Sequence, residues 1–231
     1  MGRLRGTAYR FADRCEAGRL LAVALARYAS RPDAIVLALP RGGVPVGYEI
    51  ALALRLPLDV FEVRKLGVPG HEELAMGAIA SGGLCHVRAE VAAAFRVGPA
   101  QMRDVIDRER RELERREQVY GAGRPRADVA GRTIVLVDDG LATGATMEVA
   151  LAALREQHPS AIVVAVPVAP SETCDALRTL AQDVVCLRQP APFYGVGAWY
   201  RNFRQVGDGD VRSLLHDAAS RSAGPAVIRQ P

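Results

Sequence analysis

The chain has 231 residues, with 30 Lys and Arg against 26 Asp and Glu, so its formal net charge is only +4. A charge this small requires no polyanionic partner, and a hydrophobic fraction of 49% excludes an intrinsically disordered chain. No apolar run approaches the roughly 20 residues of a membrane span, and no apolar stretch follows the first basic residues. We therefore expect a soluble, cytoplasmic protein that binds neither membrane nor nucleic acid.

Apolar runs and helical periodicities alternate along the chain. Apolar positions recur at helical spacing over residues 17–28, with Asp13 as the N-cap, and a strand-like run follows at 35–39. A second helix is expected at 45–54. The alternation continues with strands at 58–63, 134–137, 162–166 and 184–187 and helices at 146–156 and 172–180. This order predicts an α/β fold with a mainly parallel sheet flanked by helices, whose ligands bind outside the carboxyl ends of the strands.

Two stretches interrupt the alternation. Residues 75–87 hold short apolar segments around Ser81-Gly82-Gly83, which is typical of an antiparallel hairpin. Residues 101–120 predict a charged helix, and because its charges cancel we favour a solvated helix over a nucleic-acid-binding one. Its i,i+4 ion pairs would be Asp104–Arg108, Asp107–Arg111 and Glu112–Arg116, and its apolar stripe Met102, Ile106, Leu113 and Tyr120.

The strongest chemical signal is a buried strand that ends in Asp138 and Asp139 and continues through a loop of small residues into a helix. Free backbone amides at a helix N-terminus bind anions, and Gly144 lets a phosphate approach the backbone. Thr143 and Thr146 can add hydroxyl donors. We expect a phosphate monoester there, held by Leu141, Ala142, Thr143, Gly144, Ala145 and Thr146.

The acid pair needs an explanation, because carboxylates beside a bound phosphate would repel it. A ribose 5-phosphate resolves the conflict, since its neutral 2- and 3-hydroxyls can donate hydrogen bonds to Asp138 and Asp139 while its phosphate lies in the loop. The carboxylates would also stabilise positive charge that develops on the sugar. The alternative is that one acid caps the helix and the other is a surface acid, but the order of strand, acid pair, loop and helix favours a ligand site.

Three segments resemble the type I phosphoribosyltransferase family. Residues 135–147 resemble its loop for phosphoribosyl diphosphate (PRPP), residues 39–43 its pyrophosphate loop, and residues 63–70 the adenine branch. Segments 13–18 and 196–200 match a group of bacterial phosphoribosyltransferases, so the resemblance covers about residues 11–215. It implies one domain at 1–218, with a core at about 30–190, a hood from the N- and C-terminal segments, and a flexible tail at 219–231.

The resemblance also implies how pyrophosphate would be bound. Arg41, Arg64 and Lys65 would stabilise it, together with Gly42 and Gly43 of the first loop. Arginine offers phosphate bidentate contacts and lysine a point charge. A cis peptide bond is expected between Arg41 and Gly42. Without the resemblance, Arg41 would be interpreted as a residue of a surface turn, and Arg64 and Lys65 as the charged end of a strand.

The resemblance also implies a bound divalent cation and a mobile segment. The resemblance implies Mg²⁺, chelated by PRPP and held by Asp138 and Asp139 directly or through water. The segment 67–73 would close over the site and exclude water. Within it, Glu72 or Glu73 is the nearest candidate for the base that the adenine branch uses, and simple loop acidity is the alternative.

The acceptor is the least defined part of the site. Ala142 stands where the hypoxanthine and guanine members carry an Asp, which argues against a 6-oxopurine and leaves the general base unassigned. Aromatic faces stack on heterocycles, so Phe193, Trp199 and Tyr200 are candidates for contact with an acceptor base. Packing in the core or in a lid is the alternative role of these aromatics.

Together these inferences predict a Mg²⁺-dependent phosphoribosyltransferase. It would move the 5-phosphoribosyl group of PRPP to a nitrogenous base, a purine included, and release pyrophosphate. Its catalytic residues would be Asp138, Asp139, Arg41, Arg64 and Lys65. The alternative is a non-catalytic protein of the same fold that senses PRPP or a nucleotide. The sequence leaves open the base and the oligomeric state, a homodimer included.

Overall fold

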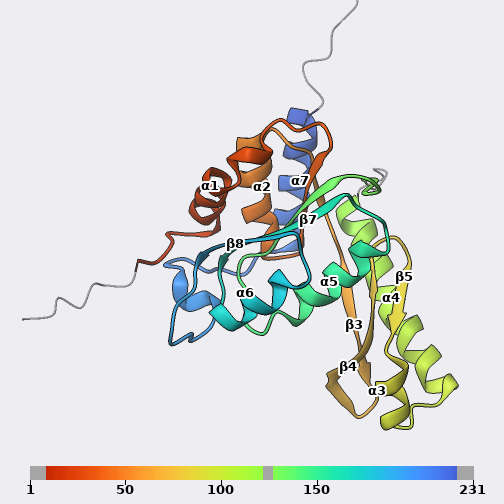
Figure 1. Ribbon diagram of the computed structural model, residues 1–231. Helices are drawn as coiled ribbons and strands as arrows, with labels where there is room; N and C mark the ends of the chain where they lie inside the picture. The colour runs from red at the N-terminus through yellow and green to blue at the C-terminus, as the bar shows by residue number, and fades with distance from the viewer. Residues whose placement is uncertain (1–8, 122–126, 223–231) are drawn as a thin grey trace, which may run out of the picture.

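A parallel five-stranded sheet in the order β2-β1-β6-β7-β8 carries the fold (Figure 1). The computed structural model describes residues 9–121 and 127–222. β1 and β6 are buried along their whole length, as expected of apolar strands covered on both faces. The strands are Ala34–Ala38 (β1), Leu58–Val60 (β2), Thr133–Val137 (β6), Ala161–Val168 (β7) and Asp183–Arg188 (β8).

Helices cover both faces of this sheet, as the alternation predicted. The side chains of Val36 and Val135 pack with helices α1, α2 and α7, whereas those of Ile35 and Ile134 pack with α5 and α6 on the opposite face (Figure 1). The carboxylate of Asp13 accepts a hydrogen bond from the Glu16 amide at 2.9 Å, which confirms the predicted N-cap. The helices are Arg14–Ala24 (α1), Gly43–Leu54 (α2), Ala145–Arg155 (α5), Ser171–Arg178 (α6) and Asp208–Ser222 (α7), and a 3-10 turn at Ala26–Tyr28 follows α1.

A second, antiparallel sheet corrects one sequence prediction. The strand expected at 58–63 is present as β2 but ends early: the chain leaves the main sheet after Val60, because β1 offers its last partner at Ala38. It then enters β3 (Val63–Val68), which pairs with β4 (His71–Ala80), and β4 pairs with β5 (Leu84–Val87). The predicted hairpin around residues 81–83 is present as the β4–β5 turn.

A long charged helix packs on the second sheet. The helix predicted at 101–120 spans Pro99–Gly121 (α4) and follows the short helix Ala89–Ala94 (α3). Met102, Ile106 and Leu113 of its apolar stripe pack on β3 and β4 in one hydrophobic cluster, whereas Tyr120 packs in the core of the main sheet. Of the three expected i,i+4 ion pairs, only Glu112–Arg116, at 2.9 Å, forms in the described part of the chain. The helix is therefore fixed by its apolar side, as expected, and less by its own ion pairs.

The two ends of the described chain meet beside the main sheet. Phe11 forms an isolated parallel bridge with Tyr200, and its amide donates to the Trp199 carbonyl at 2.9 Å. A 3-10 turn at Val196–Trp199 leads into this contact. α7 was not predicted, and it continues to Ser222, so the tail expected from 219 does not start there. Residues 223–231 lie outside the described residues. No described helix combines the length and apolar character that a membrane span requires.

A buried acid lies where the two sheets and α4 meet. The Glu62 side chain is only 2% exposed, its Oε1 has no hydrogen-bond partner, and the nearest cation, Arg116, is 3.8 Å away. Burial raises the pKa of Glu62 to about 7, and the charges of Arg116 and Arg64 offset only part of this effect. The folded protein thus holds a proton here that the unfolded chain releases above pH ~4.5.

Glu62→Gln tests this linkage. Between about pH 4.5 and pH 7 the wild type loses stability as the pH rises, because its folded state binds the extra proton. The glutamine variant lacks this loss and should be more stable than the wild type at pH ~8 by about 1–3 kcal/mol. Urea unfolding at about pH 5 and pH 8 measures the difference. Glu114→Gln, an exposed position on α4, should leave the pH slope unchanged; a Glu62→Gln variant with the wild-type slope contradicts the assignment.

Candidate functional site

The carboxyl ends of β1 and β6 lie next to each other and bring two predicted loops together. Ala38 pairs with Val137, and the Leu39 amide donates to the Val137 carbonyl at 2.8 Å. The loop containing Arg41 therefore runs beside the acid pair that follows β6. This is the sheet edge at which the sequence placed a ligand site.

The acid pair leaves two carboxylate oxygens free. Asp138 Oδ1 accepts a hydrogen bond from the Asp139 amide at 2.8 Å. Arg14 Nε donates to Asp139 Oδ2 at 2.7 Å, and both side chains of this ion pair are largely buried. The other oxygens, Asp138 Oδ2 and Asp139 Oδ1, have no donor among the described residues. Each acid thus offers one acceptor to a ligand.

Burial makes the acid pair costly to ionise. It raises the pKa of Asp138 well above the ordinary value, and the neighbouring charge of Asp139 raises it further. The pKa of Asp139 is also raised by burial, but the Arg14 guanidinium acts in the opposite direction. Arg14 is therefore the cation that favours the ionised form of Asp139.

The absence of a side chain at Gly42 makes room for Asp139. A Cβ atom at this position would lie 2.1 Å from Asp139 Oδ2, far closer than two atoms can pack. The pyrophosphate loop of the resemblance and the acid pair thus fit together only with glycine here. The cis peptide bond of this loop joins Pro40 to Arg41, one bond before the expected position between Arg41 and Gly42.

The loop after the acid pair presents unpaired amides. Those of Ala142, Thr143 and Gly144 have no acceptor among the described residues, and Gly144, with φ 79°, is the N-cap of α5. The Ala145 amide makes only a long contact of 3.4 Å with Thr143 Oγ1. These positions and the exposed Thr146 fit the predicted anion site.

Leu141 is a correction to the predicted phosphate-binding set. Its amide donates to the Val168 carbonyl at 2.9 Å and its side chain is buried, so its N–H is not available to a ligand. This bond instead ties the loop to the end of β7. The loop is held a second time by α6, where Thr173 Oγ1 donates to the Ala142 carbonyl at 2.9 Å.

Arg41 lies beside a carboxylate from another part of the chain. Its guanidinium is 3.6 Å from Asp208 Oδ1, at the first residue of α7, and its side chain is 39% exposed. Tyr120 of α4 donates to the same carboxylate oxygen at 2.8 Å. The arginine is therefore held near the site and still reachable from solvent.

Arg64 and Lys65 do not lie where the sequence placed them. Both belong to β3, and because neighbouring residues of a strand point to opposite faces, they cannot converge on one anion as a pair. Arg64 contacts Glu109 of α4 at 2.6 Å. Lys65 donates to the Glu73 carbonyl at 2.9 Å and lies 3.5 Å from its carboxylate. Their roles toward pyrophosphate stay predictions.

The segment expected to be a mobile loop forms the tip of the β3–β4 hairpin, where the register shifts around Gly67. Residues 67–73 include the end of β3, a turn and the start of β4. Glu72 accepts a hydrogen bond from the Gly70 amide at 3.1 Å, and His71 packs against the Phe95 ring at 5.4 Å. Glu73 is fully exposed beside Lys65. No contact of the described residues links these acids to the acid pair.

Tyr200 is a further correction, because its ring cannot stack on an acceptor base. It is 3% exposed and packs between Phe203 at 5.0 Å and Phe11 at 5.5 Å. Its hydroxyl donates to the Asp139 carbonyl at 2.6 Å. Phe193 and Trp199 stay candidates; both are partly exposed, and the buried Nε1 of the tryptophan has no hydrogen-bond partner.

Sequence reasoning missed three residues of the site. Arg14 belongs to a segment that supported the resemblance, but nothing local indicated that it pairs with an acid 125 positions later. Phe203, which lies under the Arg14 guanidinium at 3.9 Å, and Thr173 carry no motif. The resemblance of residues 13–18 to bacterial phosphoribosyltransferases was the only sequence signal for any of these residues, and it did not indicate what Arg14 does.

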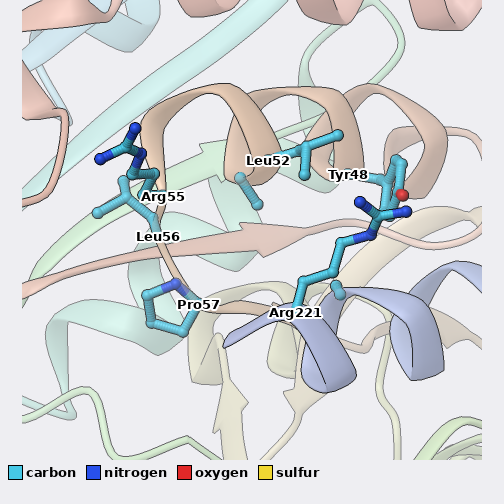
Figure 2. A pocket seen from close by; sticks show the side chains of 8 residues that line it. Tyr48, Leu52, Arg55, Leu56, Pro57 and Arg221 are labelled. Atoms are coloured by element: carbon cyan, nitrogen blue, oxygen red, sulfur yellow. The ribbon is translucent and has the colours of Figure 1, made fainter. Parts of the chain in front are cut away.

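A separate cleft of about 620 Å³ lies between α2 and α7, as Figure 2 shows. Its lining includes Leu52, Arg55 and Pro57, which precede β2, so it opens at the amino ends of the strands. Tyr48 and Arg221 in its wall both donate to Asp217. It lies at the opposite edge of the sheet from the acid pair and does not form part of this site.

Comparisons with known proteins agree with the fold and show the family. A family model described as "Phosphoribosyl transferase domain" matches residues 15–197. Two Mycobacterium tuberculosis proteins, "Putative phosphoribosyl transferase MT0597" (strain CDC 1551 / Oshkosh) and "Putative phosphoribosyl transferase Rv0571c" (strain ATCC 25618 / H37Rv), are each 43% identical over 216 residues. The match covers 94% of this chain and 48% of each relative, so the chain spans about half their length.

A solved structure extends the agreement to three dimensions. The crystal structure of TT1426 from Thermus thermophilus shares 43% sequence identity with a TM-score of 0.80. The match covers 90% of this chain and 98% of that one. The parallel sheet flanked by helices, with its antiparallel second sheet, is thus the fold of the phosphoribosyl transferase domain. The chain belongs to the phosphoribosyl transferase domain family.

Gly42→Ala tests the fit between the two loops. The new methyl group must displace the Asp139 carboxylate, so the affinity for PRPP should fall by at least about tenfold. Isothermal titration with PRPP measures it. Gly209→Ala is the matched control, because a Cβ there meets nothing within 4 Å, and it should bind as the wild type does. Equal affinities of the two variants would show that this contact does not shape the site.

Proposed function

We propose that the protein transfers the 5-phosphoribosyl group of PRPP to a nitrogenous base and releases pyrophosphate. The observation that carries this proposal is the acid pair with one free oxygen on each carboxylate, directly followed by a loop of unpaired amides. A ligand that fits both must place two hydroxyl donors beside one phosphate. A ribose 5-phosphate has this arrangement.

The phosphate end of the ligand is bound by the loop. The amides of Ala142, Thr143 and Gly144 and the exposed Thr146 hydroxyl donate to it, and the N-terminus of the 11-residue helix α5 adds positive partial charge. The loop needs no rearrangement to do so, because β7 and α6 already hold it. Anchoring the phosphate orients the sugar, which is a large share of catalysis in transfer between two bound partners.

The ribose end is bound by the acid pair. Asp138 Oδ2 and Asp139 Oδ1 accept the hydrogen bonds of the 2- and 3-hydroxyls. As the bond to pyrophosphate breaks, positive charge develops at C1, and nearby carboxylates stabilise it more in this buried setting than they would in water. The same acids thus bind the ground state and stabilise the transition state.

Arg41 is the best placed cation for the departing pyrophosphate. It belongs to the loop beside the acid pair, and its guanidinium is accessible. Pyrophosphate would replace Asp208 as its partner, while Gly42 and Gly43 let the loop pack closely on Asp139 and on the end of β6. Arg64 and Lys65 would contribute only after exchange of their own carboxylate partners, Glu109 and Glu73.

Magnesium fits the donor set of this site. Mg²⁺ prefers oxygen ligands and is commonly held by one or two carboxylates together with substrate phosphates. The free oxygens of Asp138 and Asp139 would hold it, directly or through water. When bound, it neutralises charge on the pyrophosphate group.

For the acceptor we propose only a chemical class, a nitrogenous base. Ala142 offers no side chain to accept a proton from a purine ring. Phe193 and Trp199 follow β8 and can offer ring surface to a nitrogenous base. A purine without a 6-oxo group fits these features best.

Isotope exchange of labelled pyrophosphate into PRPP tests the activity. A panel of nitrogenous bases, each with Mg²⁺, should contain at least one that supports exchange, because the reverse reaction regenerates PRPP. Tight PRPP binding without exchange for any base would instead indicate a sensor of PRPP. Absence of PRPP binding would remove both functions.

The double variant Asp138→Asn, Asp139→Asn tests the ribose site. It should weaken PRPP binding by at least about a hundredfold, because two charge-assisted acceptors are replaced. The variant should still fold, since asparagine keeps the shape of each acid and an oxygen that can accept from Arg14, which circular dichroism checks. The matched control is Asp128→Asn, an acid outside the site. Unchanged PRPP affinity in the double variant contradicts the assignment.

A further inference from the structure

We propose that Arg14 is a positioning residue of the site: its guanidinium fixes one oxygen of Asp139 and so directs the other oxygen to the ribose hydroxyl. This inference rests on the proposed binding of PRPP. It gives a role to a residue of the first helix that the sequence left without one.

Three contacts hold the Arg14 guanidinium in a single orientation. Nε donates to Asp139 Oδ2 at 2.7 Å, and Nη1 donates to the Arg204 carbonyl at 2.8 Å. The plane of the guanidinium lies over the Phe203 ring, 3.9 Å from its centroid. The Arg14 side chain is only 11% exposed, so little solvent competes with these contacts. A buried, hydrogen-bonded arginine of this kind fixes the carboxylate that it contacts.

Arg14, Phe203 and Tyr200 form a continuous set of contacts around Asp139, which we call the circuit. Phe203 stacks on Tyr200 at 5.0 Å, and the Tyr200 hydroxyl donates to the Asp139 carbonyl at 2.6 Å. Asp139 is thus held through its side chain by Arg14 and through its backbone by Tyr200. Arg14 and Tyr200, the two residues that hold Asp139, both pack against Phe203.

The circuit leaves the ligand side of Asp139 open. Arg14 and the space at Gly42 both involve Oδ2, whereas Oδ1 has no donor among the described residues. If Arg14 blocked ligand binding, its guanidinium would contact both carboxylate oxygens of Asp139. It contacts only Oδ2, so Oδ1 remains available to the ligand.

Three variants separate positioning from simple tethering. Arg14→Met keeps the apolar contact with Phe203 and removes the charge, whereas Arg14→Lys keeps the charge. Arg19→Met is the matched control, since Arg19 is an exposed residue of the same helix that contacts Glu49 at 3.3 Å. PRPP with Mg²⁺ is titrated into each protein by calorimetry from about pH 6 to about pH 9.

Arg14→Met should weaken PRPP binding by at least about tenfold across this pH range, because Asp139 loses the donor that fixes its Oδ2. Arg14→Lys should lose less affinity than Arg14→Met, and Arg19→Met should bind as the wild type does. Pyrophosphate with Mg²⁺ is titrated in the same way; because it has no ribose hydroxyls to contact Asp139, Arg14→Met should bind it as the wild type does. Wild-type PRPP affinity in Arg14→Met overturns the proposal. An equal loss for PRPP and pyrophosphate also overturns it, because that result describes a structural tether.

A second measurement separates this inference from the proposed function. If the wild type does not bind PRPP, the proposed function fails, and the stability of the same variants still tests the ion pair. Arg14→Met should unfold at a lower urea concentration than Arg19→Met, because Asp139 is then left buried without its partner. Equal unfolding midpoints of the two variants would overturn the assignment of Arg14.

Discussion

Two adjacent carboxyl groups at the end of a buried strand are the constraint on which the site depends. Burial disfavours the charge of Asp138 and Asp139, and each charge disfavours the other. The protein compensates with a guanidinium from α1, a backbone amide within the loop and a glycine that leaves space for the carboxylate. These compensations occupy one oxygen of each acid. The contacts that stabilise the charges of the two acids therefore also determine which carboxylate oxygens a ligand can reach.

The two sheets contribute differently to the chemistry. The parallel sheet fixes the acid pair and the phosphate loop, because β1, β6 and β7 are hydrogen-bonded to one another where these loops begin. Strand β3 of the antiparallel sheet carries Arg64 and Lys65 on opposite faces, each beside a carboxylate. Arg41, Arg64 and Lys65 are thus each paired with a carboxylate of the protein. An anionic ligand at this edge competes with the protein's own carboxylates, which favours a small, highly charged ligand over an extended one.

Much of the fold followed from local sequence, because its elements are set by local patterns. The strand at 134–137, the acid pair and the loop into α5 are contiguous in the chain, so one segment displayed strand, ligand groups and helix together. The exit from the main sheet at Val60 was missed, since the end of a parallel strand depends on the length of its partner β1. The roles of Arg14 and Tyr200 were missed for a related reason. An ion pair across 125 positions has no local signature, and an aromatic ring that packs cannot be told by sequence from one that stacks on a ligand.

The circuit around Asp139 joins the beginning, the middle and the end of the described chain. Arg14 lies 125 positions before Asp139, and Tyr200 lies 61 positions after it. During synthesis the sheet strands, the acid pair and the phosphate loop all emerge before Tyr200, Phe203 and the Arg204 carbonyl that brace them. Domains fold as units, and here a late segment, followed only by α7 among the described elements, supplies the brace. A polypeptide interrupted before this segment would contain every residue that touches the ligand and still lack an oriented acid pair, so the chemistry becomes available only once that late segment has docked.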